Sequence, residues 1–211
     1  MAESTGCCKC CLRLMISIGV LSLVVWLTLR ADKPKCSIQY FYLPALNKTL
    51  NTPTNSTLYF LLRLDNGNKD KGIYYDALNL TFHDNPNRSL SHLIGSHTIP
   101  GFYQGHQKKA KKGGDVQVNT TLVSRSGFPN GPAIFRVDLA TAVRFKNIFW
   151  KWKTKRRQFV VAANVEVNDQ GTKVNKKGIR LKSGAPENPY CYRAQLGVLV
   201  GLMVLVLLNF R

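Results

Sequence analysis

Two apolar segments lie near the two ends of the sequence, and they constrain the fold more than any other feature. Residues 14–29 carry no charge, and residues 196–208 form a second apolar run close to Arg211. With a rise of ~1.5 Å per residue, the first helix would be about 24 Å long and the second about 20 Å, against a hydrocarbon core of ~30 Å. Both are marginal membrane spans, so the residues between them must supply the folded domain.

The second apolar segment has the layout of a glycosylphosphatidylinositol (GPI) attachment signal. Three small residues, Ser183, Gly184 and Ala185, precede a polar spacer and then the apolar run. In such a signal the tail is removed and a lipid is joined to the small residue. We therefore expect residues 184–211 to be a propeptide and Ser183, or alternatively Gly184 or Ala185, to carry the lipid. The alternative is a short second membrane helix.

The first apolar segment is typical of a retained signal anchor, because its end lacks the small residues that signal peptidase prefers. Basic residues flank it on both sides, so the positive-inside rule does not fix its orientation. The N-glycosylation sequons favour a lumenal position for residues 30–183, the predicted ectodomain. The sequons begin at Asn47, Asn55, Asn79, Asn87 and Asn119.

The cysteines agree with this division of compartments. Four of the six lie within residues 1–13, the predicted cytosolic tail, where juxtamembrane cysteines are candidates for S-acylation. Inert thiols and a metal site are the alternatives. Beyond the anchor, Cys36 and Cys191 could pair, but GPI processing would remove Cys191 and leave Cys36 single. The four acylation candidates are Cys7, Cys8, Cys10 and Cys11.

The ectodomain has the pattern of a mainly β domain, with β-branched and aromatic runs separated by Asn, Gly and Pro. Several short strands at this spacing predict a β-sandwich. We expect the first two strands to form a hairpin, and residues 99–113 to form a loop or a short helix. The predicted strands are residues 57–64, 73–82, 133–145, 159–167 and 173–181.

The net charge of the chain is +19, and most of it lies in the predicted ectodomain. Residues 36–183 hold 23 Lys and Arg against 8 Asp and Glu, a net charge of +15 that would attract polyanions. The anchor and the sequons argue against nucleic acid. The remaining candidate ligands are acidic cell-wall polysaccharide and anionic lipid. The alternative is that the basic surface is only solvated and binds no ligand. The candidate residues form two basic clusters, the first of Lys108, Lys109, Lys111 and Lys112, and the second of Lys151, Lys153, Lys155, Arg156 and Arg157.

The sequence contains no motif that indicates catalysis, a cofactor or a metal. The four histidines lack the spacing of a zinc protease, and there is no G-x-S-x-G nucleophile elbow. We therefore expect a protein that is not an enzyme and needs no cofactor.

Four stretches carry a family resemblance: residues 30–38, 68–76, 102–106 with the lysines that follow, and 175–179. They resemble the plant harpin-induced-like family, whose members have a late-embryogenesis-abundant type 2 domain. The resemblance implies a fibronectin-III or immunoglobulin-like β-sandwich, glycosylated and GPI-processed, on the plasma membrane and facing the apoplast.

The same resemblance implies a non-catalytic role in disease-resistance signalling by coiled-coil intracellular immune receptors. Residues 1–13 would contact a membrane-associated immune regulator, and the ectodomain would help to hold the plasma membrane to the cell wall. Two features depart from the family. Its Asn-Pro-Asn turn reads Asn66-Gly67-Asn68, and its Asn-Gly-Asp adhesion tripeptide is absent where residues 168–171 read Asn-Asp-Gln-Gly.

Overall fold

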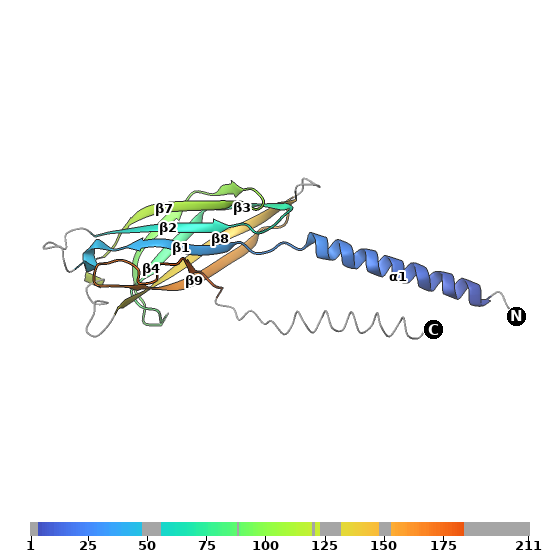
Figure 1. Ribbon diagram of the computed structural model, residues 1–211, viewed down its shortest axis with the longest axis horizontal. Helices are drawn as coiled ribbons and strands as arrows, with labels where there is room; N and C mark the ends of the chain where they lie inside the picture. Colours follow the sequence, from blue (N-terminus) through green and yellow to red (C-terminus); the bar gives the residue numbers. More distant parts are fainter. Residues whose placement is uncertain are drawn as a thin grey trace.

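A computed structural model describes residues 4–47, 56–87, 89–119, 121–122, 132–147 and 153–183. In these ranges an N-terminal helix is followed by two antiparallel β-sheets (Figure 1). The predictions of a mainly β domain and of an N-terminal helix are confirmed, while the fibronectin-III or immunoglobulin-like type stays a prediction. Asn55, Lys151, Gly184, Ala185 and the predicted propeptide, residues 184–211, lie outside the described residues.

Helix α1 spans Ser4–Leu29 and is longer than the apolar segment that predicted it. It takes in the cysteine cluster, because residues 7–18 contain neither Gly nor Pro to interrupt a helix. Cys10 and Cys11 are exposed on it. Among the residues that the structure describes, no helix meets the length and hydropathy criteria for a membrane span.

The first sheet has the strand order β10-β1-β2-β7. Strands β1 and β2 are joined by a connection that includes the short 3-10 helix η1, Pro44–Leu46. The last strand, β10, is only two residues long and pairs with β1. The bounds are β1 Lys35–Tyr42, β2 Thr57–Asp65, β7 Lys109–Gln117 and β10 Ile179–Arg180.

The second sheet is organised around β8, its longest strand. One edge of β8 pairs with β9, and the other pairs first with β4 and then with β3. Strands β5 and β6 pair with β4 and β3 in turn. The bounds are β3 Lys71–Tyr75, β4 Leu78–His83, β5 Leu93–Ile99, β6 Phe102–Gln104, β8 Ala133–Asn147 and β9 Arg157–Val167.

The predicted hairpin of residues 57–64 and 73–82 is wrong, because β2 lies in the first sheet while β3 and β4 lie in the second. The turn after β2 is held by Asn66, whose buried Nδ2 donates to the carbonyl oxygens of Lys71, at 2.9 Å, and Gly105, at 3.0 Å. These bonds hold the turn across the gap between the sheets, so the chain changes sheet instead of reversing within one.

The prediction of a loop or helix at residues 99–113 is also wrong, because this stretch holds β6 and the first part of β7. Lysine and glycine lower the β-propensity of this stretch, so its sequence pattern is weak. Strand β7 is nevertheless an edge strand, and exposed lysines there discourage pairing with another chain. Of residues 173–181, only Ile179–Arg180 forms a strand.

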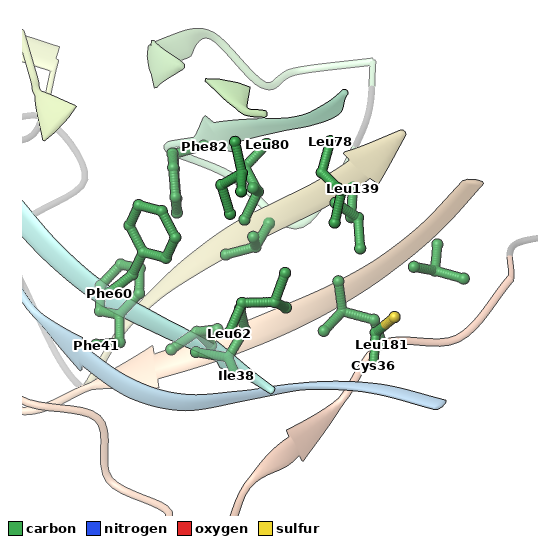
Figure 2. Packing of buried hydrophobic residues seen from close by; sticks show 14 of the residues in the cluster. Cys36, Ile38, Phe41, Phe60, Leu62, Leu78, Leu80, Phe82, Leu139 and Leu181 are labelled. Atoms are coloured by element: carbon green, nitrogen blue, oxygen red, sulfur yellow. The ribbon is translucent and has the colours of Figure 1, made fainter. Parts of the chain in front are cut away.

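The core lies between the two sheets, where side chains from both interdigitate (Figure 2). Its centre is aromatic: the ring of Phe41 lies 5.9 Å from that of Phe135 and 6.4 Å from that of Phe82, measured between centroids. Phe60 lies 5.3 Å from Phe82. Because Phe41 and Phe60 belong to the first sheet and the other two rings to the second, this cluster joins the sheets.

Cys36 belongs to this core and is only 1% exposed. Desolvation by burial raises the pKa of its thiol to about 12. The thiolate fraction at neutral pH therefore falls by about three orders of magnitude relative to an exposed cysteine.

We expect Cys36 to resist iodoacetamide in the native protein and to react once the sandwich is unfolded in guanidinium. Peptide mapping after labelling measures this directly. In protein that carries no S-acyl groups, Cys10 and Cys11 are exposed thiols and serve as internal controls in the same sample. Labelling of Cys36 at the rate of these two cysteines would contradict its burial.

Candidate functional site

The two ends of the sandwich are chemically different. The helix-proximal end is the end at which β1 begins, β2 ends and β7 begins. There Asp65 of β2 pairs with Lys35 of β1 on one side and with Lys109 of β7 on the other. The opposite, helix-distal end is where Tyr42 lies opposite Tyr59. The predicted sites divide between these two ends.

The chain that leaves α1 is fixed to the helix-proximal end by hydrogen bonds. The Asp32 backbone N–H donates to Asn68 Oδ1 at 2.8 Å, and Asn68 Nδ2 donates to the Asp32 carbonyl at 2.9 Å. The ammonium of Lys71, which is only 4% exposed, donates to the Arg30 carbonyl at 3.2 Å. It also pairs with Asp70 at 2.9 Å. The linker therefore docks on the turn that connects the sheets.

The residue predicted to carry the lipid, Ser183, follows a seam between the sheets. The Leu181 N–H donates to the Cys36 carbonyl of β1 at 2.9 Å, while Lys182 and Ala162 of β9 exchange two backbone bonds of 2.8 Å. This segment thus closes one edge of the sandwich. The chain leaves the seam at Ser183, beside the start of β1.

The predicted glycosylation sites collect at the other end. Asn47 ends η1, Asn87 lies in the turn between β4 and β5, and Asn119 follows β7, so all three are helix-distal. Asn87 and Asn119 each accept a hydrogen bond from the backbone N–H of the Ser or Thr of the same sequon, at 3.2 and 3.1 Å. Asn79 is exposed on the outer face of β4. Asn79, Asn87 and Asn119 are exposed, whereas Asn47 is half-buried.

The first basic cluster lies at the turn before β7 and along that strand. Lys108, Lys109 and Lys111 are exposed, whereas Lys112 is half-buried. The Lys112 ammonium lies 4.5 Å from the centroid of the Phe102 ring, so its charge covers the edge of the core. Lys112 therefore serves the fold as well as the surface charge.

In the second basic cluster Lys153, Lys155, Arg156 and Arg157 are all exposed. Arg156 donates to Asp76 at 2.6 Å, and Arg144 donates to the same carboxylate at 3.3 Å. The hydrogen bond from Arg156, with a smaller contribution from Arg144, lowers the pKa of Asp76. This shared carboxylate offsets part of the positive charge of the cluster.

Pairing of β3, β6 and β8 brings together residues that sequence reasoning missed. Tyr74, Tyr103 and Lys146 lie beside Lys153, and we call these four residues the tyrosine-lysine face. Of the four, only Lys153 belonged to a predicted cluster. The alternation of side chains in β3 marks Tyr74 as facing outward, but nothing in the sequence pairs it with Tyr103.

An open depression lies between β9 and the segment that ends at Ser183. Its charged lining residues, among those that the structure describes, are Arg136, Arg180 and Lys182. The lining includes Ser183, so any ligand here would compete for space with the predicted lipid attachment. The depression therefore belongs to the exit of the chain.

No family model matches the chain. The chain is 51% identical over 204 residues to Protein NDR1 of Arabidopsis thaliana. The alignment covers 94% of this chain and 92% of that protein, so the similarity extends over nearly the whole length of both.

Proposed function

The chain belongs to the family of Protein NDR1 of Arabidopsis thaliana, and on that basis we propose that it acts in plant disease resistance as a non-catalytic plasma-membrane signalling component. The single observation that carries the proposal is 51% identity over nearly the whole chain. Residues 1–13 would contact a membrane-associated immune regulator inside the cell. The glycosylated sandwich would face the apoplast.

Attachment to the membrane at two points fits the geometry of the domain. The linker from α1 and the exit at Ser183 both lie beside the start of β1, so a helix and a lipid could reach the same bilayer. Helix α1 exposes apolar side chains in the isolated chain, among them Leu14 at 58% and Trp26 at 52%. A lipid environment would cover this surface.

Phosphatidylinositol-specific phospholipase C tests the double attachment. We expect the enzyme to remove the lipid from the mature protein and to leave the protein in the membrane fraction. Intact-mass measurement before and after treatment reports the lipid, the glycans and any acyl groups on the cysteines. Release of the treated protein into the soluble fraction would contradict retention of the anchor.

The signalling role is tested by complementation of a plant line that lacks the protein. Deletion of residues 2–6, or replacement of Cys7, Cys8, Cys10 and Cys11 by serine, is expected to abolish both co-precipitation of the intracellular partner and the resistance response. Surface display, measured by labelling of intact protoplasts, should persist. A full resistance response from both variants would refute a role for the tail.

A second function is favoured by the basic surface of the domain: adhesion of the plasma membrane to the cell wall through polyanion binding. The exposed cations from Lys108 to Lys111 and from Lys153 to Arg157 supply the attraction. This function is compatible with signalling, because the tail and the domain would lie on opposite sides of the membrane. A variant that loses adhesion but keeps a normal resistance response would show that the adhesion and signalling functions are separable.

A further inference from the structure

The tyrosine-lysine face forms an accessible aromatic platform on the outer surface of the second sheet. Tyr74 of β3 lies directly opposite Tyr103 of β6. The centroids of the two rings are 4.5 Å apart, with 41° between their planes. Tyr103 keeps 47% of its surface exposed. The pair contributes to the pairing of β3 with β6, and Tyr103 also presents an accessible ring surface to solvent.

A glycine positions the platform. Gly72 is two residues before Tyr74 in β3, so the two positions share a face of the sheet. Gly72 pairs with Lys146 of β8. A Cβ at Gly72 would collide with the phenolic oxygen and the ring of Tyr103. The absence of a side chain at residue 72 therefore lets the Tyr103 ring lie flat across β3.

One lysine ammonium lies over each of the two rings. The ammonium of Lys153 lies 4.5 Å from the centroid of Tyr74, and that of Lys146 lies 6.0 Å from the centroid of Tyr103. In the described part of the chain, neither lysine has a carboxylate within ion-pair distance. This differs from Arg144 and Arg156, which share Asp76. The platform thus combines aromatic rings with cations that are available to an anionic ligand.

We propose that the tyrosine-lysine face is a binding site for an acidic polysaccharide built of uronate residues. The C–H face of a sugar ring would pack on the exposed part of the Tyr103 ring, and the carboxylate of the uronate would reach the ammonium groups of Lys146 and Lys153. A neutral sugar would satisfy only the rings, and an inorganic anion only the lysines. This assignment rests on the proposal that the domain faces the cell wall.

The face lies near the helix-proximal end, because Gly72 follows Lys71, whose ammonium donates to the Arg30 carbonyl, but it lies on the outer side of the sheet, where a polymer fits better than a lipid surface. Strands β3 and β8 run along the long axis of the sandwich (Figure 1), and Tyr74 of β3 pairs with Tyr103 of β6 on the outer face of this sheet. A bilayer below the helix-proximal end would meet the turns around residues 66–70 and 105–108 first. A flexible polysaccharide can lie along the side of the domain and contact both rings.

The test is equilibrium binding of the full mature chain, in a neutral detergent, to an oligogalacturonate. We expect Tyr103→Ser to weaken binding about tenfold, which is the effect of losing one aromatic contact. Lys146→Gln with Lys153→Gln should weaken it by a similar factor at low salt, and the effect should shrink as salt screens the charges. Gly72→Ala should weaken binding without removing an aromatic ring.

Matched controls are available on other faces. Tyr40 is also 47% exposed but lies in the first sheet, so Tyr40→Ser should leave binding unchanged. Replacement of Lys176 and Lys177 by glutamine removes the same charge from an exposed loop. Circular dichroism melts report whether each variant is folded. The methyl-esterified oligogalacturonate, which keeps the rings but loses the charge, should bind weakly to the wild type.

The outcomes separate the site from the wider function. If the wild type binds oligogalacturonate and folded Tyr103→Ser and lysine variants bind equally well, the assignment of the face is overturned, while polyanion adhesion through diffuse charge stands. If the wild type does not bind oligogalacturonate, both the assignment of the face and adhesion through polyanion binding are refuted. If these variants lose binding only to phosphatidylserine vesicles, the ligand is lipid and the polysaccharide assignment is overturned.

Discussion

The Phe82→Ala variant is expected to lose about 3–5 kcal/mol of unfolding free energy, the range measured when a buried aromatic side chain is removed from a core. Phe82 is fully buried, and its ring meets Phe41 and Phe60 from the facing sheet. Its removal leaves a cavity between two sheets rather than within one, so neither sheet alone can close it. Urea unfolding followed by circular dichroism measures the loss.

Leu93→Ala is the control for this core variant. Leu93 lies on β5, the strand paired with β4, and is 53% exposed. We expect a change within about 0.5 kcal/mol, as for most surface substitutions. Equal losses for Phe82→Ala and Leu93→Ala would mean that the aromatic cluster does not join the sheets.

The second large effect is expected from Asn66→Ala, at about 3 kcal/mol, because each buried polar group left without a partner costs ~1–3 kcal/mol. The side chain of Asn66 is fully buried and donates to the carbonyls of Lys71 and Gly105. Its Oδ1 accepts from Asn68, both from the backbone N–H at 3.1 Å and from Nδ2 at 2.9 Å. An alanine supplies none of these bonds.

Asn66→Ala should also loosen the linker, because Asn68 holds Asp32 and would lose its own support. Hydrogen exchange at the Asp32 amide measures this second effect. Asn164→Ala, at an exposed position of β9, is the control and should change neither quantity. Unchanged exchange at Asp32 in a destabilised Asn66→Ala variant would show that the linker is held independently of the turn.

Sequence patterns predicted the elements whose residues alternate or form continuous apolar runs. Residues 57–64, 133–145 and 159–167 became β2, β8 and β9 because β-branched and aromatic side chains fill a half-buried pleat. The pattern could not predict which sheet each strand joins. That choice depends on buried hydrogen bonds from Asn66, a residue whose sequence context is equally typical of a hairpin turn.

The candidate site was only partly predictable for the same reason. Runs of lysine are visible in a sequence, so Lys108 and Lys153 were found. Tyr74 and Tyr103 are far apart in the chain and come together only through the pairing of β3 with β6. Lys146 lies outside both predicted basic clusters, and its position over the Tyr103 ring follows only from the pairing of the strands.

The seam before Ser183 has a mechanical consequence. A pull on a lipid at Ser183 would load the few bonds that tie residues 181 and 182 to Cys36 and Ala162. A pull on α1 would instead load β1, which pairs along its length with β2. If the proposed lipid and the proposed adhesion to the wall are both present, tension between wall and membrane is expected to peel β10 away first. The helix would hold until the sheet itself sheared.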